Sequence, residues 1–150
     1  IMEVINGTWS LTEVPDEFFD VLKILGYSGL ERKYVKRNKL SFTASVKDAI
    51  LTIKFESKFY SKVKEYKLNG LPVEYQDDRK NTILEVSQWN EEEKSIEVKN
   101  IYLEKGFTIL NKHKLFNDDQ ECHHELKLVS PDQDDDIIVN LVYTRVNNDK

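Results

Sequence analysis

The chain has 150 residues, of which 39% are hydrophobic and 33% charged, and its 27 acidic and 22 basic side chains give a formal net charge of -5. This length fits one domain spanning residues 1–150, which would bury roughly 70% of its unfolded surface. The composition excludes a disordered chain and leaves too little apolar sequence for a membrane-spanning helix. The acidic balance excludes a general affinity for nucleic acid, because phosphate backbones are bound by basic surfaces.

The cysteine content indicates the redox state of the protein's cellular compartment. Cys122 is the single cysteine and cannot close an intramolecular disulfide. The first residues also lack the basic end and apolar run of a signal peptide. We therefore expect a reducing compartment, the cytoplasm, and a monomeric protein.

Residues 6–26 predict one strand and a first helix. Polar and apolar residues alternate over residues 6–11, which is typical of a strand with Trp9 on its apolar face. After Pro15, the apolar residues Phe18 and Leu22 recur at helical spacing, and Gly26 ends the pattern. A short amphipathic helix is predicted here.

A second helix is predicted over residues 28–38. Ser28 and Glu31 have the spacing of a capping box, in which each side chain bonds the other's backbone N–H. The helix carries four basic residues, which could meet acidic lipid head groups or remain a solvated face. They are Arg32, Lys33, Lys36 and Arg37.

The rest of the chain alternates with period 2 in runs as short as typical strands. Turn signals such as Asn69-Gly70 and Lys105-Gly106 separate these runs. The predicted strands cover residues 40–46, 50–57, 58–68, 73–77, 79–89, 95–103, 108–116, 121–129 and 137–145. Consecutive hairpins with one inserted helical pair favour an all-β, up-and-down barrel over a parallel α/β sheet.

Alternation places two histidines inside this barrel. Over residues 108–116, His113 shares a face with apolar residues while lysines occupy the other face. Over residues 121–129, His124 lies on the apolar face and His123 on the charged face. A hairpin turn centred on residues 118–119 sets His113 directly opposite His124.

This order of elements, headed by Gly7-Thr8-Trp9, resembles the intracellular lipid-binding proteins, the family of fatty-acid-binding and cellular retinoid-binding proteins. The resemblance extends over about residues 4–146. It implies a lipocalin-like, ten-stranded antiparallel β-barrel, or β-clam, whose cavity is covered by a helix-turn-helix lid. Its further motifs are Phe18, Leu22, Gly26, Arg32-Lys33, Leu51-Thr52-Ile53-Lys54, Glu56-Ser57-Lys58-Phe59, Asp77-Asp78-Arg79-Lys80 and Tyr143.

The resemblance also implies where a ligand would be anchored. Family members commonly hold a carboxylate through one arginine on the eighth strand and an Arg-x-Tyr pair on the tenth. In this chain His113 takes the first arginine's place and Leu141 the second's, so that only Tyr143 remains. The candidate cavity anchors are His113, Tyr143, Arg79, His124, Asn100 and Tyr102, and Phe59 is the candidate portal residue.

Three interpretations of the missing arginines stay open. The two histidines become charged, or the head group is held elsewhere, for example by Arg79, or the natural ligand is neutral. The leading functional hypothesis is a non-enzymatic intracellular carrier of a long-chain fatty acid or similar hydrophobic lipid, without a cofactor. Transient membrane contact through the helical lid is a further expectation.

Two other hypotheses compete with a carrier. Large inward side chains would make the barrel a structural or interaction protein with a filled interior. Cys122, His124 and His113 together would make a zinc or copper site. Catalytic motifs such as Gly-x-Ser-x-Gly or His-Glu-x-x-His do not occur in the sequence, so no enzyme is predicted.

Overall fold

The structure is a computed structural model that describes residues 2–11, 13–38, 40–57 and 60–146. Ten strands form one antiparallel sheet in the order β4-β3-β2-β1-β10-β9-β8-β7-β6-β5. The strands are β1 (Gly7–Leu11), β2 (Ser41–Lys47), β3 (Ile50–Ser57), β4 (Tyr60–Lys67), β5 (Asn69–Gln76), β6 (Thr82–Asn90), β7 (Ser95–Tyr102), β8 (Thr108–Phe116), β9 (Glu121–Val129) and β10 (Ile137–Arg145). The helices are η1 (Met2–Ile5), a short 3-10 helix, and α1 (Asp16–Ile24) and α2 (Gly29–Arg37).

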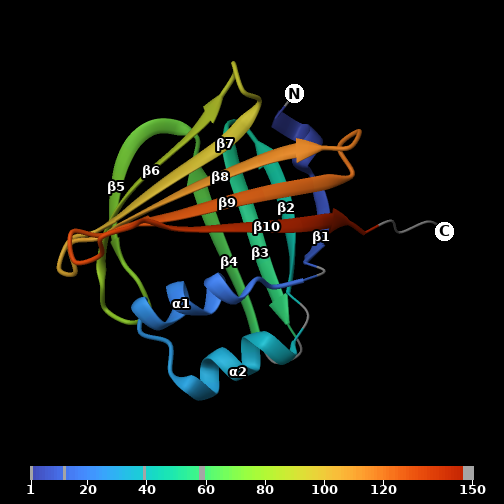
Figure 1. The fold of residues 1–150 in the computed structure, drawn as a ribbon. Coiled ribbons are helices and arrows are strands. Elements are labelled where there is room, and N and C mark those ends of the chain that lie inside the picture. Colours follow the sequence, from blue (N-terminus) through green and yellow to red (C-terminus); the bar gives the residue numbers. More distant parts are fainter. Residues whose placement is uncertain (1, 12, 39, 58–59, 147–150) are drawn as a thin grey trace.

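The sheet curls into a nearly closed barrel because its first and last strands pair. Trp9 lies opposite Arg145 where β1 meets β10, while every other pairing joins strands adjacent in the sequence. β4 and β5 are left as the two edges of the described sheet. The two helices α1 and α2 lie together across one end of the barrel (Figure 1), and α1 packs near β10. The predicted up-and-down barrel with a two-helix lid is confirmed.

Local sequence explains the lid. Ser28 accepts a hydrogen bond from the Glu31 N–H at 3.1 Å, and the Glu31 carboxylate accepts one from the Ser28 N–H at 2.9 Å. This is the predicted capping box, and it fixes the start of α2. Gly26 follows α1 with φ at +97°, a conformation that side-chain-bearing residues rarely adopt. Within the described ranges, no helix is long and apolar enough to cross a bilayer.

The inner face of the barrel carries the core. Alternate residues of each strand point inward, so that neighbouring strands bury their apolar side chains against one another. Trp9, Ile83, Ile96, Leu128 and Leu141 are the largest fully buried side chains. The lid adds Val21 of α1, which is also fully buried. Helices and sheet therefore share one apolar interior.

Two predicted boundaries are wrong, and both errors concern turn chemistry. β5 begins at Asn69, where a turn was expected, because Gly70 with φ at +72° is absorbed into the strand and shifts its register before Pro72. β6 begins only at Thr82. The preceding turn is held by the Asp77 carboxylate, which accepts hydrogen bonds from the N–H groups of residues 79 and 81.

Arg145 ties the two ends of the described chain together. Its guanidinium donates to the carbonyl oxygens of Val4 and Asn6 at 2.7 Å each and to that of Asp119 at 3.0 Å. It also lies over the Trp9 ring, 4.3 Å from the ring centroid. Gly7 makes room for this contact, since a Cβ there would lie 2.8 Å from Nη1 of Arg145. Arg145 is therefore a structural cap at the barrel rim.

We predict that Arg145→Gln lowers the free energy of unfolding by about 2 to 4 kcal/mol, because three charge-assisted hydrogen bonds and a cation–π contact are lost together. Urea denaturation followed by far-UV circular dichroism measures this change. Arg37→Gln is the matched control, since Arg37 is exposed at the end of α2, and it should change stability by less than about 0.5 kcal/mol. Equal effects of the two variants would contradict the capping role.

Candidate functional site

The barrel encloses a cavity of about 230 Å³. Its apolar wall consists of Ile5, Phe42, Leu51, Ile53, Ile96 and Val98. Three further aromatic residues, Phe55, Tyr66 and Tyr143, line it, and Phe55, near the C-terminal end of β3, is 39% exposed. The cavity does not favour the hypothesis of a filled interior.

The polar part of the wall centres on the predicted histidine pair. His113 and His124 lie opposite each other in the register of β8 and β9, with stacked rings whose centroids are 4.0 Å apart. His124 Nε2 donates to Asn111 Oδ1 at 2.8 Å, and Asn111 Nδ2 donates to the Val98 carbonyl at 3.3 Å. Inward placement of both histidines is confirmed. Asn111 is the residue that sequence reasoning did not single out.

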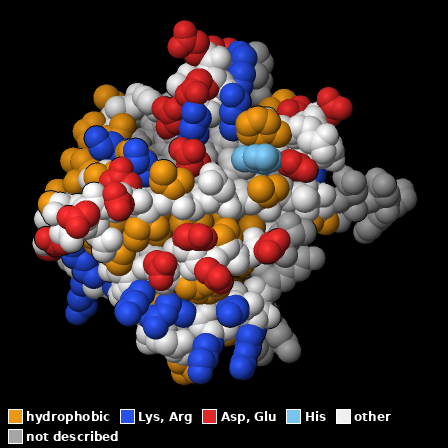
Figure 2. Space-filling model, in the orientation of Figure 1, with side chains coloured by type: hydrophobic (Ala, Val, Ile, Leu, Met, Phe, Trp, Pro, Cys, Tyr) orange, Lys and Arg blue, Asp and Glu red, His pale blue; other side chains and the backbone are white. Residues whose placement is uncertain are grey.

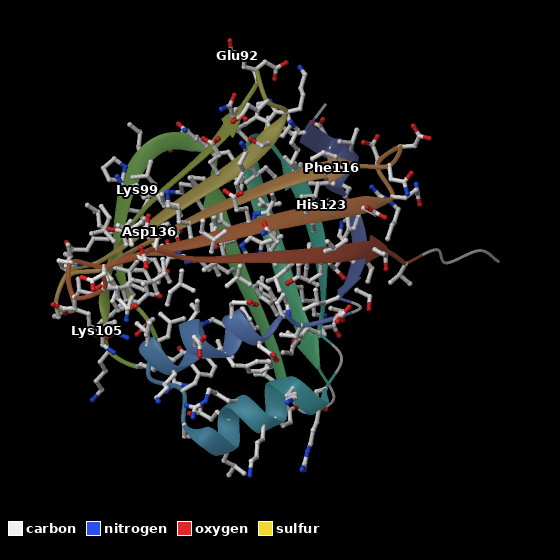
Figure 3. All side chains as sticks on the ribbon, in the orientation of Figure 1. Glu92, Lys99, Lys105, Phe116, His123 and Asp136 are labelled. Carbon is white, nitrogen blue, oxygen red and sulfur yellow. The ribbon has the colours of Figure 1, made fainter. Side chains whose placement is uncertain are left out.

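His123 occupies the opposite face of β9, as predicted. Its Nε2 lies 3.0 Å from a Glu121 carboxylate oxygen, and its ring packs against Phe116 with centroids 4.3 Å apart. Figure 3 labels His123 and Phe116 at neighbouring ends of β9 and β8. One strand thus carries one histidine to each side.

Burial determines the charge of the cavity histidines. Desolvation lowers the pKa of His113 from 6.5 to about 4, and desolvation together with the nearby His113 lowers the pKa of His124 well below its usual value. Both imidazoles are therefore neutral near pH 7. The interpretation that needs charged histidines therefore requires proton uptake when the ligand binds.

Three more predicted anchors occupy the same inner face. Tyr143 lines the cavity, its ring packs edge-on against Phe42 at 4.9 Å, and burial raises the pKa of its hydroxyl. Asn100 also lines the cavity, and its Oδ1 is buried with no hydrogen-bond partner among the described residues. Tyr102 is buried but stacks on Phe107 at 4.5 Å, outside the cavity lining.

A buried ion pair lies beside this cavity and was missed by sequence reasoning. Lys64 of β4 and Glu85 of β6 lie 3.0 Å apart, with side chains 22% and 7% exposed. Lys64 Nζ sits 3.8 Å from the Tyr75 ring centroid, and the Tyr75 hydroxyl donates to Glu85 at 3.2 Å. The signal was present, because alternation along β4 puts Lys64 on the same face as Tyr66, which lines the cavity.

This architecture matches solved structures of lipid-binding proteins. Apo lipid binding protein 8 of Caenorhabditis elegans superposes with a TM-score of 0.79 at 13% identity, covering 97% of this chain and 98% of that chain. Fatty-acid-binding protein 1 of Echinococcus granulosus gives 0.75 at 14% identity, with 97% and 99% covered. The Schistosoma mansoni fatty acid binding protein in complex with arachidonic acid gives 0.73 at 18% identity, with 97% and 98% covered. The fold is that of the fatty-acid-binding proteins.

The likeness lies in the backbone. No protein-family model matches the chain, and no curated protein sequence matches it. With identities of 13–18%, the shared fatty-acid-binding fold carries no information about individual side chains. The properties of the cavity must therefore be read from the residues of this chain.

Arg79 lies at the lid and does not line the cavity. It sits in the turn before β6, where its guanidinium donates to the Gly26 carbonyl at 3.0 Å and pairs with Glu31 at 2.6 Å. The guanidinium also lies 4.2 Å from the Tyr27 ring centroid. These contacts connect the barrel to the start of α2. The portal prediction for Phe59 falls outside the described residues.

A metal site is not supported by the geometry. The described part of the chain contains no group of three His, Cys, Asp or Glu side chains placed to hold an ion. Burial raises the pKa of the Cys122 thiol to about 12, so this side chain is a neutral thiol at neutral pH. Cys122 therefore acts as a small apolar core residue.

We predict that acidification destabilises the protein through His113. Its pKa is near 6.5 in the unfolded chain and about 4 in the folded one, so the unfolded state binds more protons in this window. The free energy of unfolding should fall as pH drops from about 6.5 to 4, by about 1 to 3 kcal/mol. Urea denaturation across this range measures the loss, and His113→Gln should reduce the slope. An unchanged slope would show that His113 is already charged when folded.

Proposed function

We propose that this protein is a non-enzymatic carrier that binds a hydrophobic lipid in the barrel cavity. The observation that carries this proposal is an enclosed, mostly apolar cavity inside a β-barrel whose end is covered by two helices. Concave apolar sites with a few convergent polar groups are typical of small-molecule binding. The proposal places the protein in the cytoplasm as a monomer, in keeping with its single buried cysteine.

Burial of an alkyl chain supplies the affinity. Each methylene removed from water contributes about 0.8 kcal/mol, so ten buried methylenes contribute about 8 kcal/mol, which corresponds to a micromolar dissociation constant. The cavity of about 230 Å³ is smaller than typical ligand pockets of roughly 300 to 1,000 Å³. A long chain therefore requires the barrel to widen, and we place this movement near Phe55 and the lid.

His113, His124, Asn100 and Tyr143 are the proposed head-group contacts. All four line one cavity and combine hydrogen-bond donors with acceptors. Arg79 is proposed instead to hold the lid in place through Gly26 and Glu31. Tyr102 is proposed to support the wall beneath Asn100, two residues away on the same face of β7.

The carrier proposal predicts displacement of Nile red, a neutral fluorescent dye, from delipidated protein by long-chain lipids. Saturable displacement at micromolar concentration is expected, with affinity rising as the alkyl chain lengthens because more methylenes are buried. Fluorescence titration measures it. Failure of every long-chain lipid to displace the dye at micromolar concentration would refute the proposal.

Membrane contact through the lid is a second part of this proposal. Lys33, Lys36 and Arg37 are exposed on α2, and Leu30 of the same helix is 81% exposed. Figure 2 shows blue side chains gathered at the lower end of the visible face, where Figure 1 places α2. Arg32 is turned away, since it donates to the Tyr27 carbonyl at 2.6 Å. The exposed cations fit an anionic membrane surface.

We predict that the double variant K33E/K36E slows lipid transfer to vesicles containing anionic phospholipid by about tenfold or more, because each basic residue near such a surface contributes about 1 kcal/mol. Stopped-flow transfer of a fluorescent lipid measures the rate. K47E/K99E is the matched control, because it changes the net charge equally at exposed barrel positions. Equal slowing by both variants would contradict a specific role for α2.

A further inference from the structure

The charges around the cavity are arranged unfavourably for an anion. Among its described lining residues there is no lysine, arginine, aspartate or glutamate. The inward-facing ion pair is net neutral, and Glu85 lies directly opposite Asn100 in the pairing of β6 with β7. A carboxylate placed at Asn100 would therefore meet a second carboxylate as its neighbour.

The other candidate cations are already engaged. Arg79 is bonded to Gly26 and Glu31 at the lid, and Arg145 is bonded to backbone carbonyls at the rim. Lys64 is held against Glu85 and the Tyr75 ring. An anionic head group would have to break one of these contacts before gaining a counter-charge.

The hydrogen-bonding groups point to a head group that donates. Asn100 Oδ1 is a buried acceptor with no partner among the described residues, and only a donor can satisfy it. An ionised carboxylate offers acceptors alone, whereas a hydroxyl or an amide N–H offers a donor as well. The neutral imidazole of His113 and the Tyr143 hydroxyl line the same cavity, and each can donate a hydrogen bond to the oxygen of such a group.

We infer that the ligand of this barrel is a long-chain lipid with an uncharged, hydrogen-bond-donating head group, such as a primary alcohol or an amide, and that Asn100 accepts its hydrogen bond. This inference rests on the proposed carrier function and specifies the head group. It distinguishes this protein from a carrier of ionised fatty acids. The titratable groups that face the site or contact it are Glu85, Lys64, Tyr66, Tyr75, His113, His124 and Tyr143.

The test is a chain-matched series displacing Nile red from delipidated full-length protein at pH 7.4. The four ligands are dodecan-1-ol, dodecanamide, methyl dodecanoate and dodecanoic acid. The alcohol and the amide should bind about tenfold tighter than the acid, and the ester, which has no donor, should bind more weakly than the alcohol. An acid that binds as tightly as the alcohol would overturn the inference and leave the carrier intact. Failure of all four would overturn the carrier proposal and this inference with it.

Repeating the titration at pH 5 distinguishes protonation of the ligand from protonation of the protein. At pH 5 more of the dodecanoic acid is neutral, so its affinity should rise toward that of the alcohol without exceeding it. An acid that overtakes the alcohol at pH 5 would show that His113 or His124 becomes a cation on binding, which contradicts an uncharged site.

Variants at Asn100 assign the contact. Asn100→Leu should weaken dodecan-1-ol about tenfold and leave methyl dodecanoate unchanged. Asn100→Asp keeps an acceptor, so the alcohol should still bind while the acid is weakened further. Lys99→Ala, on the outer face of the same strand, is the matched control, and circular dichroism checks that each variant folds. Equal loss of alcohol and ester in Asn100→Leu would overturn the assigned hydrogen bond.

Discussion

Pairing between β1 and β10 is the constraint on which the rest of this structure depends. It joins the first and last strands of the chain at residues 9–11 and 143–145, so that the ten described strands form one curved sheet with one face of each strand turned inward. Without it the strand order would divide into two sheets, β4 to β1 and β10 to β5, each with an uncovered apolar face. Trp9 and Arg145 meet at this junction, where an aromatic ring and a guanidinium hold the start of the chain against its last strand.

Enclosure then determines the chemistry of the polar residues inside. His113 and His124 are polar by composition, yet burial favours their neutral forms and their rings stack within the wall. Lys64 and Glu85 are charged by composition, yet they compensate each other across the barrel. The interior is therefore polar without being charged overall, which suits an amphiphile whose head group also lacks charge.

Much of the fold follows from residue alternation in the sequence. Alternation placed His113 opposite His124 and His123 outside, because a strand's side chains switch faces at every residue. It failed at Gly70 and Asp77, where a bulge and a side-chain-capped turn moved the strand ends. The site was harder to predict. Arg79 and Glu31 are 48 residues apart in the sequence, and only the folded lid brings Arg79 Nη2 to 2.6 Å from Glu31 Oε2. No local sequence pattern predicts this contact.

The edges of the sheet have a consequence for solution behaviour. β4 and β5 end the described sheet, and an unpaired strand edge can template the addition of strands from another molecule. Val63, Leu71 and Val73 on these strands are exposed, which would increase that tendency. Proline at position 72, which has no N–H to donate, and the lysines along β4 oppose it. The open seam between β4 and β5 is thus the place where the chain guards against self-association.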